Sequence, residues 1–197
     1  MKPILIVYAT TEGHTAKIVS RIGDVIEQSG RRARIVCASD EVPPDLDIES
    51  YDGVIVGGSV HGGHHQRPIV TFVKENRAAL ERVRTAFFSV SLMAAGESAE
   101  SHEAAMQFVR NFEEQTGWLP DMAVLFPGAL LYTHYGWVKK FIMKMIVKRQ
   151  GGPTDTSHDY ELTNWESVTH FAEDFVASLE ERASPLAPSA PHTERSL

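Results

Sequence analysis

The sequence predicts an α/β protein in which a doubly wound parallel sheet carries helices on both faces. Short apolar runs rich in β-branched residues alternate with longer segments whose apolar residues recur at helical spacing. The short runs are apolar throughout, which is typical of strands that are buried on both faces. A chain that alternates such strands with helices forms one parallel sheet covered by helices on both sides.

The first half of the chain supplies three of the expected strands and two of the expected helices. The strands are “PILIVYA” (3–9), “RARIVCA” (32–38) and “YDGVIVGGS” (51–59). A helix is predicted from Thr15 to a stop at Gly30, because four apolar residues between them recur at helical spacing: Ile18, Ile22, Val25 and Ile26. The segment “PIVTFVKENRAALERV” (68–83) predicts a second helix with Pro68 in its first turn.

The second half of the chain continues this alternation and ends in a polar tail. “TAFFSVSLM” (85–93) is a fourth strand, and “MAVLFPGALL” (122–131) is a fifth strand or a strand pair. Helices are expected over 98–117, 135–149 and 164–182, the last with Trp165 and Phe171 in the core. We therefore expect one domain over 1–182, with an insertion at 128–156 and a disordered tail at 183–197, which is rich in Pro, Ser and Ala.

The bulk properties are those of an ordinary globular protein and exclude several classes. The 197 residues, 43% hydrophobic and 23% charged, fit one soluble domain. The single cysteine, Cys37, excludes an internal disulfide; we expect it to be a buried small hydrophobe in a protein of the reducing cytoplasm. No signal peptide and no membrane-spanning helix are expected. The net charge of −7 argues against nucleic-acid binding.

One basic segment stands out against this acidic balance. Residues 134–150 contain five Lys or Arg and no acid. On the helix expected there, three lysines at a spacing of four share one face, and apolar residues fill the other. Such a helix can lie in an anionic membrane interface, and the alternatives are a core-facing helix with solvated lysines or a dimer contact. The residues of this predicted arm, for membrane or substrate, are Tyr132, Trp137, Lys139, Lys140, Phe141, Lys144 and Lys148.

Three loops are expected at one edge of the sheet, where ligands bind in open parallel sheets. The first, 9–15, is rich in hydroxyls and lacks both the lysine of a P-loop and the GxGxxG dinucleotide fingerprint. Its N–H groups and hydroxyls can hold a phosphate at a helix N-terminus. Because no cation lies in the turn, that phosphate belongs to a ligand that stays bound. The alternative is a plain helix cap with spare threonines.

The other two loops follow the third and fourth strands. Loop 58–65, “GSVHGGHH”, has glycines that let the backbone approach a flat ligand closely. Its histidines, His61, His64 and His65, have no acid or cysteine beside them at ligand spacing, so we expect contacts to a ring edge or to solvent and no metal site. Loop 89–97 is small and polar and faces the same edge.

The turn “TTEGHT” resembles the phosphate loop of flavodoxins, which takes the 5′-phosphate of FMN. The resemblance covers residues 2–180 and implies FMN as cofactor and a five-stranded sheet of order 2-1-3-4-5. More narrowly, the chain is similar to the flavodoxin-like, menaquinone-dependent protoporphyrinogen IX dehydrogenases. The stretches that carry this similarity are “YDGVIVGGSVHGGHH”, “AFFSVSL”, “PGALLY”, “FIMKMIVK”, “GGPTDT” and “NWESV”.

This resemblance implies FMN-dependent oxidation of protoporphyrinogen IX to protoporphyrin IX, a step of heme biosynthesis, with menaquinone or ubiquinone as acceptor. The flavin carries the chemistry, so no catalytic acid or base is assigned. A cytoplasmic protein held on the inner face of the cell membrane is expected, and a homodimer is plausible. The residues expected to bind FMN are Thr10, Thr11, Glu12, Gly13, His14, Thr15, Ser59, Val60, His61, Gly62, His64, Ser89, Val90, Ser91 and Leu92.

The chain departs from the family in the segment “LLYTHYGW”, where the family often carries arginines. Here Leu131, His134 and Gly136 stand in that segment, so a role in holding propionates or anionic lipid would pass to Lys139 and Lys140. Three other functions stay open at this point. They are a flavodoxin-type electron carrier with no substrate of its own, an FMN quinone reductase using NAD(P)H, and a scaffold that has lost FMN.

Overall fold

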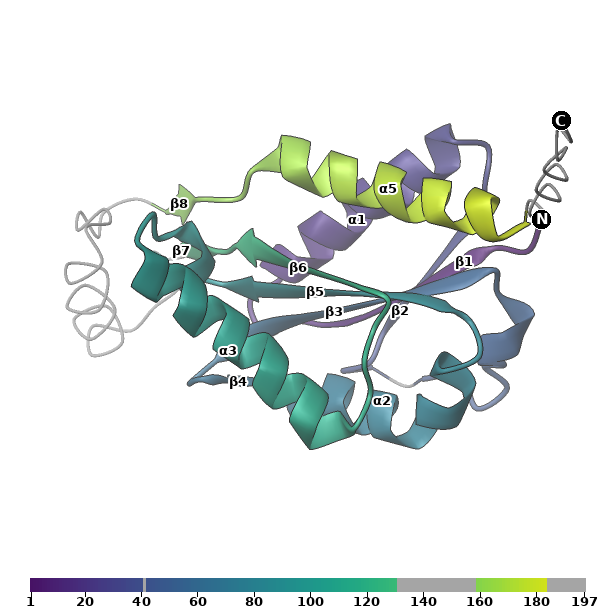
Figure 1. Ribbon diagram of the computed structural model, residues 1–197, viewed down its shortest axis with the longest axis horizontal. Helices are drawn as coiled ribbons and strands as arrows, with labels where there is room; N and C mark the ends of the chain where they lie inside the picture. The colour runs from purple at the N-terminus through teal and green to yellow at the C-terminus, as the bar shows by residue number, and fades with distance from the viewer. Residues whose placement is uncertain (41, 131–158, 184–197) are drawn as a thin grey trace, which may run out of the picture.

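The computed structural model describes residues 1–40, 42–130 and 159–183, and in them one parallel sheet carries helices on both faces (Figure 1). The sheet order is β2-β1-β3-β5-β6, which in chain order of the parallel strands is the predicted 2-1-3-4-5. A short strand β4 pairs antiparallel with the end of β3. The bounds are β1 (Ile4–Ala9), β2 (Ala33–Cys37), β3 (Gly53–His61), β4 (His64–His65), β5 (Arg84–Ser91) and β6 (Met122–Pro127).

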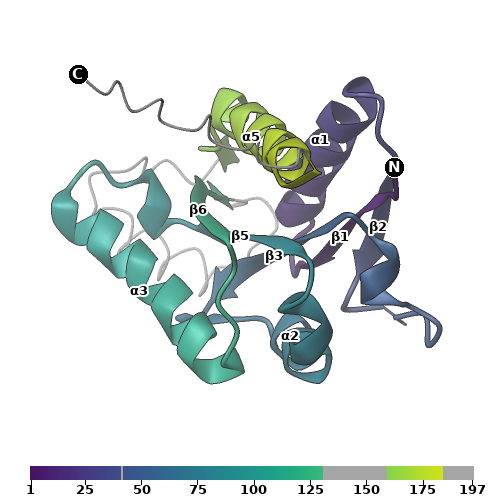
Figure 2. The ribbon, with the colours of Figure 1, turned by 45° about the vertical axis from the view of Figure 1, so that its right-hand side comes forward.

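The four α-helices among the described residues divide evenly between the two faces of the sheet. Helices α1 (His14–Gln28) and α5 (Trp165–Ala183) cover one face, and α2 (Arg67–Leu80) and α3 (Ala99–Thr116) cover the other (Figures 1 and 2). These four helices were predicted within a few residues of their ends. Short 3₁₀ turns lie at Ile48–Ser50 and Met93–Ala95. In the described ranges no helix is long and apolar enough to cross a membrane.

The predicted fifth strand is a pair of strands. After β6, the short strand β7 (Ala129–Leu130) leaves the main sheet and pairs antiparallel with β8 (Tyr160–Glu161), forming a two-stranded ribbon. The expected helix over 135–149, with the whole predicted arm, lies outside the described residues. The same holds for the tail after Ala183.

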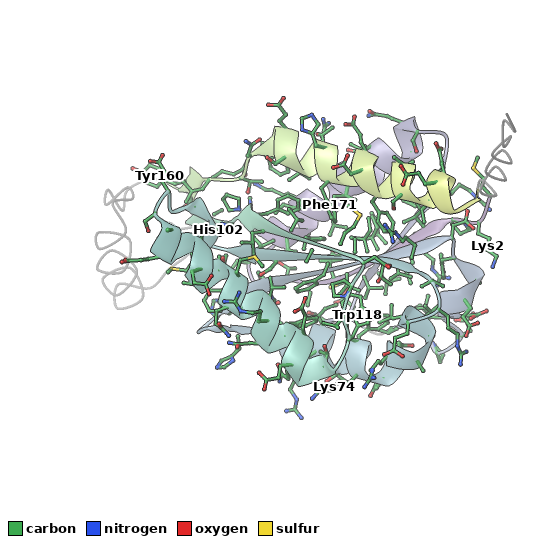
Figure 3. All side chains as sticks on the ribbon, viewed as in Figure 1. Lys2, Lys74, His102, Trp118, Tyr160 and Phe171 are labelled. Atoms are coloured by element: carbon green, nitrogen blue, oxygen red, sulfur yellow. The ribbon has the colours of Figure 1, made fainter. Side chains whose placement is uncertain are left out.

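The core has two layers because every central strand is apolar on both faces. Along β1, Ile4 and Ile6 pack toward α1 and α5, whereas Leu5 and Val7 pack toward α2 and α3, and all four are 0% exposed. Side chains that alternate along one strand thus contribute to both layers of the core. Figure 3 shows Phe171 between α5 and the sheet and Trp118 on the opposite side.

Two residues expected in the core are only half-buried. Cys37 ends β2, which is an edge strand with β1 as its one neighbour, so the cysteine is partly open to solvent. The same edge leaves Ile35 45% exposed. Trp165 is the first residue of α5 and packs against the core from its margin, whereas Phe171, deeper in the helix, is buried as expected.

Candidate functional site

The turn between β1 and α1 is built on Gly13. Its φ of 82° is a left-handed conformation that glycine adopts without steric cost. The Gly13 N–H donates to Oγ1 of Thr10 at 3.0 Å, which closes the turn. Helix α1 therefore begins directly at the carboxyl end of a central strand, where its open N–H groups point out of the sheet edge.

Thr15 provides a hydroxyl with no partner inside this turn. The residue is 1% exposed, and its Oγ1 is buried without a hydrogen bond. Such an orphaned group costs free energy unless a ligand satisfies it. The first turn of α1 contains no acidic residue, and the nearest acid before it is Glu12, so the helix dipole favours an anion at the helix start. The turn has the donors and the field that a bound phosphate requires.

A tight hairpin joins β3 to β4 beside this turn. Gly62 and Gly63 have φ of 59° and 87°, which a type I′ hairpin turn requires of both its central residues. His61 and His64 pair across the hairpin and are exposed at its tip. Among the residues that the structure describes, no group of three His, Cys, Asp or Glu could hold a metal ion.

His65 anchors the hairpin to the core. Its Nε2 lies 2.9 Å from Oγ of Ser89 on β5, and its ring meets Phe87 and Phe112 edge-on, with centroids 5.3 and 5.0 Å away. Burial, with a smaller contribution from neighbouring His64, lowers the pKa of His65 to about 4. The imidazole is therefore neutral at pH 7 and acts as a fixed packing and hydrogen-bonding group.

Gln66 links the hairpin to the turn before α1. Its side-chain oxygen accepts the backbone N–H of Ser59 at 3.1 Å, and its amide nitrogen donates to the Ser59 hydroxyl. The same nitrogen lies 3.4 Å from Oγ1 of Thr11. One side chain thus contacts two of the three loops expected to surround a ligand.

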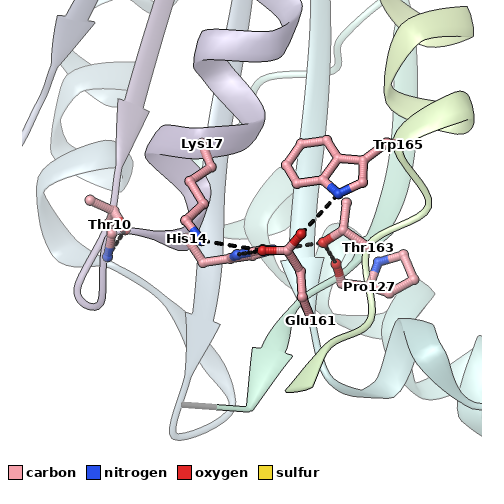
Figure 4. Close-up of polar contacts among 8 residues, drawn as sticks. Thr10, His14, Lys17, Pro127, Glu161, Thr163 and Trp165 are labelled. Carbon is pink, nitrogen blue, oxygen red and sulfur yellow. Dashed lines mark hydrogen bonds and ion pairs between the residues drawn. The ribbon is translucent and has the colours of Figure 1, made fainter. Parts of the chain in front are cut away.

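A polar cluster closes the other side of the turn (Figure 4). Nε2 of His14 lies 2.6 Å from Oγ1 of Thr163, and the Thr163 hydroxyl donates to the Pro127 carbonyl at 2.7 Å. Glu161 accepts hydrogen bonds from Lys17 at 3.2 Å and from the indole of Trp165 at 2.9 Å. These contacts join the start of α1 to β8 and the segment before α5.

Charge and burial act in opposite directions in this cluster. Burial lowers the pKa of His14, although the nearby Glu161 carboxylate opposes the shift, and Lys17 adds to it. For Glu161, partial burial acts to raise the pKa, but the hydrogen bonds from Trp165 and Lys17 outweigh it and hold the pKa below its ordinary value. At pH 7 the cluster therefore contains a neutral His14 beside an ionised Glu161.

Comparison with known proteins places the chain in a family. It matches the flavodoxin domain family over residues 5–157. It is 32% identical over 172 residues to protoporphyrinogen IX dehydrogenase (quinone) of Escherichia coli strain K12, covering 87% of this chain and 93% of that protein. The protein of the same name from Leishmania major is 31% identical over 175 residues, covering 88% of this chain and 74% of that one. The chain belongs to the flavodoxin-like family of protoporphyrinogen IX dehydrogenases.

Solved structures agree on the fold of this dehydrogenase family member. A short-chain flavodoxin associated with a non-canonical PDU bacterial microcompartment superposes with a TM-score of 0.58 at 14% identity, covering 91% of this chain and 99% of that one. A flavodoxin from the domain Archaea gives a TM-score of 0.52 at 18% identity, covering 90% and 99%. Both confirm the predicted flavodoxin-like sheet.

The structure brings the predicted FMN-binding segments to one sheet edge but separates the roles of their side chains. The imidazole of His14 points to Thr163, so His14 offers a ligand its backbone and not its side chain. Ser89 and Val90 are 0% and 3% exposed and face the core layers. The Ser91 hydroxyl accepts the Ala94 N–H at 3.2 Å within its own loop. The remaining candidates lie on the turn, the hairpin or the loop after β5: Thr10, Thr11, Glu12, Gly13, Thr15, Ser59, Val60, His61, Gly62, His64 and Leu92.

FMN is the cofactor of the flavodoxin domain, and the residues present fit its phosphate. The orphaned hydroxyl of Thr15, the glycine turn and the open N–H groups at the helix start are what a tightly held phosphate monoester needs. A side chain at Gly62 or Gly63 would be strained, so the hairpin keeps a bare backbone at its tip.

Sequence reasoning missed Gln66, Glu161 and Thr163. Gln66 carries a weak signal, because it is the N-cap of α2 directly before Arg67 and Pro68. Thr163 has no local signal, since its partner His14 is 149 positions away. The glutamate lies at the end of a two-residue strand that hydrophobic periodicity does not detect.

The buried His65 makes a testable contribution to acid stability. Because its pKa falls from an ordinary 6.5 to about 4 on folding, the unfolded chain binds the extra proton between these values, and stability is lost as the pH falls through that window. Between about pH 7.5 and about pH 5 the loss from this group is about 2 kcal/mol. We expect His65→Gln to lower the free energy of unfolding at neutral pH. On acidification, the variant should lose less of its unfolding free energy than the wild type loses. Urea unfolding at both pH values measures these differences.

The control is the exposed His170→Gln, which removes a histidine from the surface of α5. Parallel pH dependence of the wild type and His65→Gln would contradict the assignment of His65 as the buried neutral histidine.

Proposed function

We propose that this protein oxidises protoporphyrinogen IX to protoporphyrin IX, with FMN as its redox group and a membrane quinone as electron acceptor. The observation that carries the proposal is the match along 93% of the length of an enzyme with that name. The reaction is a step of heme biosynthesis, and the family assignment supports an oxidoreductase.

The residues of the turn would hold the phosphate of FMN. The backbone N–H groups at the start of α1 and the Thr15 hydroxyl are its donors, and the helix dipole favours its negative charge. Thr10 keeps the turn closed through its bond to the Gly13 N–H. When bound, FMN supplies a ring that accepts hydrogen from the substrate.

The hairpin and the loop after β5 would border the flavin ring. We assign these side chains no proton transfer to or from the substrate. They orient the ring and limit its contact with water. His65 fixes the hairpin to β5, and Gln66 ties it to Thr11, so both are positioning residues. His61 and His64, exposed at the hairpin tip, are the side chains proposed to contact the ring edge or the substrate.

Anaerobic reduction separates this proposal from its rivals. We expect the purified protein to carry flavin absorbance that bleaches with protoporphyrinogen IX and recovers with a menaquinone analogue. A flavin that stays oxidised with porphyrinogen but bleaches with a flavodoxin reductase would instead identify an electron carrier. Bleaching by NAD(P)H alone would identify a quinone reductase.

The basic segment 135–149 is the proposed membrane contact, and it lies outside the residues that the structure describes. Its lysines give a net positive charge on an otherwise acidic chain, and each Lys near an anionic surface contributes about 1 kcal/mol. We expect the protein to float with anionic liposomes at low salt. Changing Lys140, Lys144 and Lys148 to Glu should abolish flotation, whereas the same charge change at the exposed Lys2, Arg32 and Lys74 should not. Equal flotation of the two triple variants would contradict a membrane contact through this segment.

A further inference from the structure

His14 lies in the turn between β1 and α1 (residues 10–15), which we call the phosphate turn. Its side chain faces away from the opening of this turn. The imidazole is 7% exposed, and its Nε2 contacts Oγ1 of Thr163 at 2.6 Å. The Thr163 hydroxyl has one hydrogen, which it donates to the Pro127 carbonyl at 2.7 Å. Its oxygen must therefore accept a hydrogen from Nε2 of His14. The result is a directed chain of two hydrogen bonds, the first buried and the second partly buried, from His14 through Thr163 to Pro127.

This chain ends at the base of the β7–β8 ribbon. Pro127 is the last residue of β6, and Gly128 after it donates to the Ser91 carbonyl at 3.1 Å. The Gly128 carbonyl in turn accepts the N–H of Leu162 at 3.1 Å, directly beside the paired residues of β7 and β8. The Thr163 hydroxyl therefore joins the two backbone segments from which the ribbon emerges.

Glu161 supplies a second tie between the same two regions. Its carboxylate on β8 accepts from Lys17 of α1 at 3.2 Å and lies 3.8 Å from Nδ1 of His14. Nδ1 is buried without a hydrogen-bond partner. The start of α1 is thus fixed to the ribbon by a buried contact through Thr163 and by a more exposed one through Glu161.

The backbone of His14 belongs to the phosphate turn. Its N–H follows Gly13 and precedes that of Thr15, and both open N–H groups point out of the helix start. Holding the imidazole on Thr163 therefore also fixes the residue whose backbone faces the phosphate. If the ribbon base moves away, His14 loses a buried partner and the turn loses its support.

We propose that His14 is a positioning residue that couples phosphate binding at the start of α1 to the order of the β7–β8 ribbon, through the Thr163 hydroxyl. The inference rests on the proposed FMN site. Coupling between two sites is reciprocal, so FMN must stabilise the ribbon base to the same degree as the ribbon base strengthens FMN binding. A histidine that only fills space would contribute to stability without either effect.

The test compares FMN affinity in two threonine variants of the full-length apoprotein. Thr163→Val keeps the shape of the side chain but removes the hydroxyl, and we expect it to weaken FMN binding about ten-fold by fluorescence titration. Thr163→Ser keeps a hydroxyl and should bind FMN with the affinity of the wild type. The matched control is Thr169→Val, since Thr169 also joins α5 to α1, through Arg21 at 3.1 and 3.0 Å, but away from the turn. Wild-type affinity in Thr163→Val, or an equal loss in Thr169→Val, would overturn the proposal.

Hydrogen exchange of the wild type tests the reciprocal effect without any variant. We expect FMN to slow exchange of the Leu162 amide, which bonds to the Gly128 carbonyl. Riboflavin, which lacks the phosphate, should slow it less at equal occupancy. The same Leu162 exchange rate with and without FMN would overturn the coupling.

These two experiments also distinguish the coupling from the function on which it rests. Neither experiment needs porphyrinogen. If the protein binds FMN and turns over substrate normally but shows no coupling, only this inference is rejected. Wild-type protein that binds no FMN would reject both.

Discussion

The left-handed turn at Gly13 is the constraint on which the rest of the candidate site depends. It lets the chain pass from a largely buried central strand into α1 within four residues, and a side chain there would be strained. The helix start is thereby placed at the carboxyl edge of the sheet, with Thr15 buried and unpaired. The same turn sends the imidazole of His14 to Thr163, so the proposed phosphate site and the ribbon base share one piece of backbone.

Most of the fold could be predicted from the sequence because its physical signals are local. β1 is apolar at consecutive positions and is buried on both faces, as a central parallel strand must be. Helix α3 ends at Thr116 and is capped by Gly117, whose φ of 68° is the left-handed conformation that favours glycine at a helix C-terminus. The turn at residues 10–15 has an equally local signal, because its hydroxyls and its glycine lie within six residues, and its role in holding a phosphate stays a prediction.

The parts that could not be predicted depend on contacts between distant residues. Three histidines of one loop look alike in sequence, but only the hairpin register turns His65 into the core and leaves His61 and His64 outside. Gln66 reaches Thr11 across 55 positions, and that contact exists only once β1 and β3 are neighbours. The spacing of apolar residues predicts which face of a strand or helix is buried, but it does not predict partial exposure at the end of that element. Cys37 and Trp165 were therefore expected to be buried.

Above all, we propose that the start of α1 holds the phosphate of FMN. The most direct measurement is the affinity of the apoprotein for FMN and for riboflavin, which differ only in that phosphate, in the wild type and in Thr15→Val. We expect riboflavin to bind the wild type at least about 100-fold more weakly than FMN, and Thr15→Val to narrow this difference in affinity. Equal affinity of the wild type for the two flavins would contradict it.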